Sequence, residues 1–384
     1  MRSNYKRLGD YINEINIKNS DNKISNLLGV SNNKYFIPSI ANINGTDLSK
    51  YKVVKQGQFA YGPVTSRNGD KISIALMEED EAIVSTSYTT FEIINHEELL
   101  PEYLILWFKR PEFDRYARFM SHGSVREIFD WEKMCNVMLP IPDRVKQEEI
   151  VHLSKLLVNS ISKSKRISNL INSILVNRFF DMFPEFTLDE KLNQDIFPSF
   201  SIGELINLYN GYAFQSDRYD DNGNYSVITI GNVQNDLLDL DKVNKIIKIP
   251  KNMPINCRLN EKDLLMSLTG NIGRTCFVIG ENHLLNQRVC KIAPKNNENL
   301  AFVLALLNTD EMLNKLNSIS GGTAQQNLST RVFEAINLYN IDPAKLKAFA
   351  RMNKLLNYKF YSLKNYYKSI ELMTQIIPEL LTNV

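Results

Sequence analysis

Apolar residues along the chain follow two kinds of pattern, one after the other, and this succession occurs twice. The first pattern consists of short runs of β-branched and aromatic residues separated by Asn- and Gly-containing turns, which is typical of half-buried strands. The runs that predict strands are Tyr51–Val54, Phe59–Tyr61, Lys71–Met77 and Ile83–Ile94, then Tyr225–Ile230, Asp263–Leu268, Thr275–Ile279 and Arg288–Ile292.

The second pattern predicts helices. Proline suits the first position of a helix, and Pro101 and Pro111 begin the predicted helices Pro101–Lys109 and Pro111–Met120. The corresponding helices of the other half are predicted at Leu300–Leu307 and Asp310–Ile319.

Each half then closes with a long helix. The stretch from Arg144 to Phe180 contains neither proline nor glycine, and its apolar residues recur at heptad spacing. We expect the seams of the two long helices to pack on each other in antiparallel fashion, while packing of each helix on its own half is the alternative. The predicted seam comprises Ile150, Leu153, Leu157, Ile167, Ile171, Ile174, Phe349, Met352, Leu356, Leu363, Tyr366, Ile370 and Met373, with Lys359 as its one charged member.

The two halves are an internal repeat. Moving residues 100–178 forward by 199 positions places them on 299–377 without a gap, so that Asp143 meets Asp342. The expected fold class is α+β, with two mixed α/β domains related by pseudo-two-fold symmetry and joined by two long helices that form an antiparallel coiled coil. The predicted bounds are 1–143 for the first domain, 144–183 for the first long helix, 184–199 for a connector, 200–342 for the second domain and 343–384 for the second long helix.

Composition narrows the class of protein. The formal net charge of +2 argues against binding nucleic acid by bulk charge alone, although it leaves room for local basic patches. The four cysteines form no Cys-x-x-Cys pair, so we expect reduced thiols in a cytoplasmic protein. The start of the chain is polar and no apolar run is long enough to cross a bilayer, so no signal peptide or membrane span is expected.

Catalytic and cofactor motifs are not found in the sequence. It lacks Gly-x-x-x-x-Gly-Lys-[Ser/Thr], Gly-x-Gly-x-x-Gly, Gly-x-Ser-x-Gly and the Asn/Asp-Pro-Pro-aromatic tetrad that amino-methyltransferases use. The four histidines are scattered, with no pair at metal-ligand spacing. The acidic run Glu78–Glu81 is expected to be a solvated loop, and a cation site is its alternative.

Polar loops supply candidates for contact with nucleic acid. Arg pairs with guanine and Asn with adenine, so Arg67 and Asn68 suit base reading, and the loop 269–274 occupies the related place in the second half. Amide side chains beside a Gly-rich turn suit contact with bases or phosphates, although they can equally satisfy the turn itself. The full set of candidates is Arg67, Asn68, Lys71, Arg126, Tyr212, Gln215, Lys245, Asn271, Arg274, Gln325, Gln326 and Asn327.

The order of these features resembles the DNA specificity subunit of Type I restriction–modification systems. The resemblance rests on phrases that recur at corresponding places and covers the chain nearly end to end. These phrases are Leu8-Gly9-Asp10 and Ile202-Gly203-Glu204, Gly211-Tyr212-Ala213-Phe214, Gly321–Ser329, Pro140-Ile141-Pro142, Gln147–Ile150 and Arg178–Phe183. Two segments depart from the family pattern, Gly123–Asp130 and Tyr339-Asn340-Ile341, which puts identical docking of partners by the two halves in doubt.

The resemblance implies a non-catalytic subunit with several partners. Each half would read one part of a split site on double-stranded DNA, and the long helices would form a spacer between the parts. Two modification subunits carrying S-adenosylmethionine would bind the helices and methylate adenine, and restriction subunits would add ATP- and Mg-dependent activity. No cofactor or metal is expected on this chain. The alternatives are a protein-interaction scaffold that never touches DNA and an enzyme with an unrecognised site, for example a nuclease at Glu78–Glu81.

Overall fold

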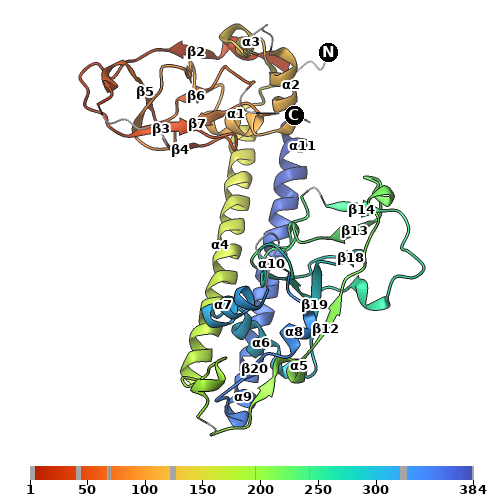
Figure 1. Ribbon diagram of the computed structural model, residues 1–384. Coiled ribbons are helices and arrows are strands. Elements are labelled where there is room, and N and C mark those ends of the chain that lie inside the picture. Colours follow the sequence, from red (N-terminus) through yellow and green to blue (C-terminus); the bar gives the residue numbers. More distant parts are fainter. Residues whose placement is uncertain are drawn as a thin grey trace. The chain divides into compact units, whose positions relative to one another are not determined.

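The computed structural model describes residues 5–39, 45–66, 69, 71–121, 127–194, 196–241, 243–320 and 327–382 (Figure 1). The chain divides into two compact units. Unit 1 comprises Met1–Asn159 and Ser369–Val384, and unit 2 comprises Ser160–Lys368. In the described part of the chain, no helix is both long enough and apolar enough to cross a membrane.

Two four-stranded sheets form the β part of unit 1. The strand orders are β2-β9-β6-β7 and β4-β3-β8-β5, and β3 pairs with β8 in parallel whereas the other pairs are antiparallel. The strands are β2 (Ile12–Ile15), β3 (Leu27–Val30), β4 (Phe36–Pro38), β5 (Lys52–Lys55), β6 (Phe59–Tyr61), β7 (Ile74–Leu76), β8 (Glu81–Val84) and β9 (Thr89–Ile93). The predicted run Ile83–Ile94 is therefore two strands, because a turn in which the Tyr88 N–H donates to the Ser85 carbonyl separates them.

Unit 2 repeats this topology strand for strand. Its sheets have the orders β12-β19-β16-β17 and β14-β13-β18-β15, and the pair β13 and β18 is again the parallel one. The strands are β12 (Ile206–Asn210), β13 (Tyr225–Ile228), β14 (Asn244–Ile246), β15 (Arg258–Leu259), β16 (Leu264–Ser267), β17 (Thr275–Phe277), β18 (His283–Leu285) and β19 (Val289–Pro294). The mixed α/β fold class and the internal repeat are thus confirmed, while the symmetry axis stays a prediction.

The helices correspond as closely as the strands. Helices α1 (Pro101–Phe108), α2 (Pro111–Met120) and α3 (Trp131–Cys135) have their counterparts in α6 (Leu300–Leu307), α7 (Asp310–Ile319) and α8 (Thr330–Glu334). The two-stranded pairs also correspond, β1 (Tyr5–Arg7) with β10 (Met138–Pro140) and β11 (Phe200–Ser201) with β20 (Asn337–Leu338).

The glycine of the opening phrase in each half has a packing reason. Gly9 lies in the short turn η1 (Leu8–Asp10), and a Cβ on it would come within 2.7 Å of the Cβ of Cys135 at the end of α3. Gly203 lies in α5 (Ile202–Leu205), and a Cβ there would come within 3.1 Å of the Glu334 carbonyl oxygen at the end of α8. A side chain at position 9 would therefore clash, and one at position 203 would require the end of α8 to shift slightly.

The first long helix is α4 (Arg144–Met182). The second is interrupted: α9 (Pro343–Phe349), the 3₁₀ turn η7 (Ala350–Met352), α10 (Asn353–Glu371), the π-helical turn η8 (Leu372–Ile376) and α11 (Ile377–Thr382) follow one another. Asp143 and Asp342 begin the two stretches in the same way, because each carboxylate accepts from a backbone N–H of the first turn, at 2.9 Å from Lys146 and 2.8 Å from Ala344.

Within each unit the long helices pack antiparallel. In unit 1, the hydroxyl of Ser154 lies 3.8 Å from the sulfur of Met373. In unit 2, the Ser362 hydroxyl donates to the Ser164 carbonyl at 2.7 Å, and the ring centroids of Phe179 and Phe349 are 6.5 Å apart. Residue numbers along α4 therefore increase while those of the contacting residues on the second long helix decrease, as antiparallel packing requires.

Two predicted seam positions are wrong. Ile167 and Ile174 are 45% and 41% exposed, whereas Ser168 and Leu175 beside them are 1% and 0% exposed. Of the other predicted positions, Ile150, Leu157, Ile171, Phe349, Leu356 and Leu363 are buried, and Leu153, Met352, Tyr366, Ile370 and Met373 are half-buried. Buried positions of α4 recur at alternating spacings of three and four residues from Gln147 to Leu175. They are Gln147, Ile150, Ser154, Leu157, Ser164, Ser168, Ile171 and Leu175, with half-buried Ile161 between them, and Val151 and Phe179 are buried in addition.

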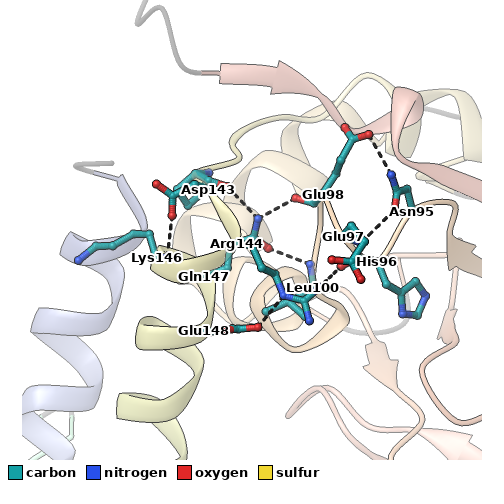
Figure 2. Close-up of polar contacts among 11 residues, drawn as sticks. Asn95, His96, Glu97, Glu98, Leu100, Asp143, Arg144, Lys146, Gln147 and Glu148 are labelled. Atoms are coloured by element: carbon teal, nitrogen blue, oxygen red, sulfur yellow. Dashed lines mark hydrogen bonds and ion pairs between the residues drawn. The ribbon is translucent and has the colours of Figure 1, made fainter.

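A buried amide holds α4 to the sheet-bearing part of unit 1 (Figure 2). Gln147 is fully buried, and its side chain accepts from the Leu100 N–H at 2.8 Å and donates to the carbonyls of Glu98 and Pro142 at 2.8 and 2.9 Å. In unit 2 the side chain of Asn353 at the start of α10 has the corresponding role. It accepts from the Ala301 N–H at 2.9 Å and donates to the carbonyls of Asn297 and Glu298. An amide suits this position because it can accept from and donate to backbone groups at once.

Candidate nucleic-acid interface

Four loops of unit 2 converge on one place, which we call the loop cluster: residues 210–212, 268–274, 286–288 and 327–328. The Tyr212 N–H donates to the Leu285 carbonyl at 2.9 Å, and the Gln287 N–H donates to the Tyr212 carbonyl at 3.1 Å. The Leu268 N–H donates to the Arg288 carbonyl at 3.0 Å. Backbone hydrogen bonds therefore fix these loops against one another.

Gly211 allows the closest of these approaches. A Cβ on Gly211 would stand 2.0 Å from the Asn286 carbonyl oxygen and 2.2 Å from its carbon, so only glycine fits. Tyr212 follows directly, its hydroxyl donating to the Asn252 side chain at 2.9 Å and its ring lying 5.1 Å from that of Phe214. The Gly-Tyr-Ala-Phe phrase thus marks a point where two loops touch.

The loop 269–274 begins at a backbone bridge that both halves share. Thr269 pairs with Asn327, and the Leu328 N–H donates to the Leu268 carbonyl at 2.8 Å. In unit 1, Val64 pairs with Ile128, and the Phe129 N–H donates to the Pro63 carbonyl at 2.8 Å. Val64 and Thr269 therefore occupy the same place in the fold, and the predicted loops follow them in the sequence.

Two candidates of this loop contact each other. Arg274 is half-buried and donates to the Gln234 side chain at 2.9 Å, and the amide oxygen of Asn271, turned towards Arg274, accepts from it at 2.7 Å. The guanidinium is thus positioned by neighbours within unit 2 while Asn271 is exposed. Gly270 and Gly273 have φ values of 69° and 82°, which permit the tight turn around Asn271.

The other candidates are scattered or lie outside the described residues. Gln215 is exposed before the turn η4 (Ser216–Arg218), Lys245 is half-buried in the edge strand β14, and Lys71 is exposed in unit 1. The loop cluster contains Tyr212, Asn271, Arg274 and Asn327. The candidates outside the described residues are Arg67, Asn68, Arg126, Gln325 and Gln326.

Sequence reasoning missed two polar residues of the loop cluster. Gln287 and Arg288 are exposed and stand directly before β19. No spacing in the sequence connects them to the other candidates, because they meet Tyr212 and Leu268 only through the pairing of distant strands. The one available signal is the run Asn286-Gln287-Arg288, which separates two apolar strands.

The cysteine thiols and the acidic run Glu78–Glu81 lie in different surroundings. The cysteines are free, and burial raises the pKa of the Cys290 thiol to about 12 and that of the Cys276 thiol further still, which disfavours the thiolate. The residues from Glu78 to Glu81 are exposed and form a bend that leads into β8, of which Glu81 is the first residue. Within the described ranges, no group of three or more His, Cys, Asp or Glu residues could hold a metal ion.

Comparisons with known proteins show which family model and which solved structures this chain is similar to. Residues 197–340 match the family model described as the Type I restriction modification DNA specificity domain. A solved S subunit of the Type I restriction–modification system from M. genitalium is similar in structure, with a TM-score of 0.55 at 13% identity over 98% of this chain and 94% of that one. An HsdS subunit from Thermoanaerobacter tengcongensis gives a TM-score of 0.40 at 13% identity over 99% of this chain and 97% of that one.

A comparison with curated proteins gives no match. The matched domain includes the whole loop cluster, and the similarity to the M. genitalium subunit concerns the fold. Residues 197–340 are thus similar to the DNA specificity domain of Type I restriction–modification systems, and the chain has a fold similar to that of the M. genitalium S subunit.

Proposed function

We propose that this chain selects the DNA sequence on which a Type I complex acts, by reading a two-part site with one half of the chain for each part. One observation carries the proposal: the same strand and helix topology occurs twice, with different residues at corresponding loops. Val64 and Ile128 in unit 1 stand where Thr269 and Asn327 stand in unit 2. A shared framework that presents different side chains suits the reading of two different sequences.

The chain contributes recognition rather than chemistry in this proposal. The specificity-subunit family is non-catalytic, and we assign methyl transfer with its S-adenosylmethionine to modification subunits. ATP and Mg²⁺ belong to restriction subunits. That the long helices set the separation of the two parts of the site stays a prediction.

An exchange of halves tests the proposal. Residues 1–143 are replaced by those of a family member with another specificity, and the chimera is assembled with modification subunits. Because each half reads one part of the site, we expect one part of the methylated sequence to change while the other remains. The measurement is the sequence of methylated adenines in a random DNA library.

The reciprocal exchange of residues 200–342 is the matched control and should change the other part. A scaffold that never contacts bases predicts that both chimeras methylate the original sequence, and that result would refute the proposal.

Helix α4 carries an exposed apolar stripe that suits a protein partner. Ile167, Leu170 and Ile174 are 45%, 56% and 41% exposed, and their spacing of three and four residues puts them on one face. Contiguous apolar side chains on a surface mark interaction sites more often than single ones do. We propose that a modification subunit packs a helix against this stripe.

Replacing all three stripe residues by serine tests the docking. Since these side chains are exposed, each change should alter the free energy of unfolding by only about 0.5 kcal/mol. Capture of the modification subunit should fall at least about tenfold, measured by co-purification at fixed concentrations. The control is Ile255→Ser, which removes a 73% exposed isoleucine from η5 (Ile255–Cys257) and should leave assembly intact. Equal capture by all variants would rule the stripe out.

A further inference from the structure

A small polar pocket lies within the loop cluster. Its volume is about 240 Å³, and it is lined by Thr269, Gln287, Arg288 and Asn327. Thr269 is 6% exposed, and within the described part of the chain its hydroxyl has no hydrogen-bond partner. A buried hydroxyl without a partner is costly, so a polar ligand entering the pocket would satisfy it.

The four side chains have the chemistry of a base-reading site. Arg288 presents a guanidinium, and the amides of Gln287 and Asn327 each offer a donor and an acceptor. None of the four lining residues is a carboxylate, so nothing in the lining repels an electron-rich base edge. Guanine offers two neighbouring acceptors in the major groove, N7 and O6, which arginine can bind together.

The bridge that borders the pocket has polar side chains only in this half. At the corresponding bridge of unit 1, Val64 and Ile128 replace Thr269 and Asn327, and the backbone pairing is the same. The polar side chains are therefore not needed to hold the bridge, which leaves them available for a ligand.

We propose that this pocket reads one guanine of the part of the site that the second half recognises, with Arg288 as the specificity-determining residue. The inference rests on the proposed function and adds to it the base and the residue. A backbone phosphate is the less suitable ligand, because its oxygens only accept hydrogen bonds. The major-groove edge of a G·C pair also presents the N4–H2 donor of cytosine, which an amide oxygen of Gln287 or Asn327 can accept.

The test uses Arg288→Ala in the complex with modification subunits and S-adenosylmethionine. Because Arg288 is exposed, the variant should assemble normally. Methylation rates are measured on duplexes carrying each of the four bases at every position of the site. We expect the preference for guanine at one position of the second part to fall about 10- to 100-fold, with the first part of the site unaffected.

Gln287→Ala is the second variant, and it should weaken discrimination at the same position or at its neighbour. Arg258→Ala is the matched control, because it removes an exposed arginine of unit 2 that does not line the pocket. It should leave every base preference unchanged.

Three results would overturn the inference. Unchanged preferences in Arg288→Ala would show that the pocket reads nothing. A second result is that Arg288→Ala binds all duplexes more weakly by the same factor, and that the slope of log affinity against log salt concentration falls by about one. This result would show a phosphate contact instead. If the complex without substitutions showed no sequence preference, the proposed function would fail together with the inference. The first two results would contradict the inference only and would leave the proposed function intact.

Discussion

At the scale of single residues, a buried polar group in unit 2 joins both long helices to a loop of the second domain. Lys359 is 1% exposed, and its ammonium lies 2.6 Å from the carboxylate of Asp236 and 2.5 Å from the amide oxygen of Asn172. The other carboxylate oxygen of Asp236 accepts from Asn172 at 2.7 Å and from Ser168 at 3.2 Å. Burial lowers the pKa of Lys359, and the adjacent Asp236 opposes that shift.

Lys359→Met tests the contribution of this group. Removing one partner leaves the other charge buried, so we expect the free energy of unfolding to fall by about 3 kcal/mol. Lys364→Met on the same helix is the control. Lys364 pairs with Glu261 at 2.9 Å but is 45% exposed, so its loss should cost under about 1 kcal/mol. Denaturant titration measures both, and equal effects would contradict the assigned role.

At the scale of elements, the serines of α4 change how its seam must be interpreted. A hydrophobic pattern favours isoleucine over serine at the seam of a helix. The sequence therefore predicts that Ile167 and Ile174 are seam positions and passes over Ser168. The structure buries Ser168 because Asp236, which lies far away in sequence, accepts its hydrogen bond. Hydrophobicity alone could not identify that position, since the partner that compensates for burying a hydroxyl comes from another element.

At the same scale, Asn340 gives a structural role to the segment Tyr339-Asn340-Ile341, which stands where a Pro-x-Pro phrase was expected. Asn340 has a φ of 60°, and its side chain donates to the Glu185 carbonyl at 2.9 Å and accepts from the Gln194 N–H at 3.1 Å. It therefore holds the connector between the two domains against unit 2. Asn340 makes these contacts at the place where the first half has Ile141 of Pro140-Ile141-Pro142.

Gly211→Ala should disturb the loop cluster selectively. The new Cβ would clash with the backbone of Asn286, so the loops must separate at a cost of about 1–3 kcal/mol. We expect discrimination at the second part of the DNA site to be lost while the first part is read normally, measured by methylation of duplexes altered in either part. Gly231→Ala is the control, because its Cβ would meet only the Thr229 hydroxyl oxygen, at 3.8 Å. Normal reading of both parts by Gly211→Ala would contradict the assignment.

At the scale of the whole molecule, charge balance predicts dependence on partners. The chain has 45 Lys and Arg residues against 43 Asp and Glu residues, so it has little bulk attraction for DNA. We expect the isolated chain to bind its site weakly and to lose binding steeply with added salt. Binding should become strong when modification subunits share the phosphate contacts. The Kd at two salt concentrations, with and without those subunits, measures this, and full affinity of the chain alone would refute it.

The sequence by itself determined the repeat and the order and type of most elements. Helices α2 and α7 have the predicted bounds because the signals that start them act locally. Proline begins α2, the Thr309 hydroxyl caps α7, and apolar periodicity runs through both. Strands were found less completely, because a short strand such as β1 is stabilised by a partner more than 100 residues away.

Only the tertiary structure decided which loops meet. Asn327 and Thr269 follow from the predicted patterns, but Gln287 and Arg288 join them through the pairing of β16 with β19. Likewise Lys359 is stable in a helix seam only because Asp236 is brought to it. Local patterns report the conformation of the segment that contains them, whereas a binding pocket or a buried ion pair depends on the path of the chain between distant segments.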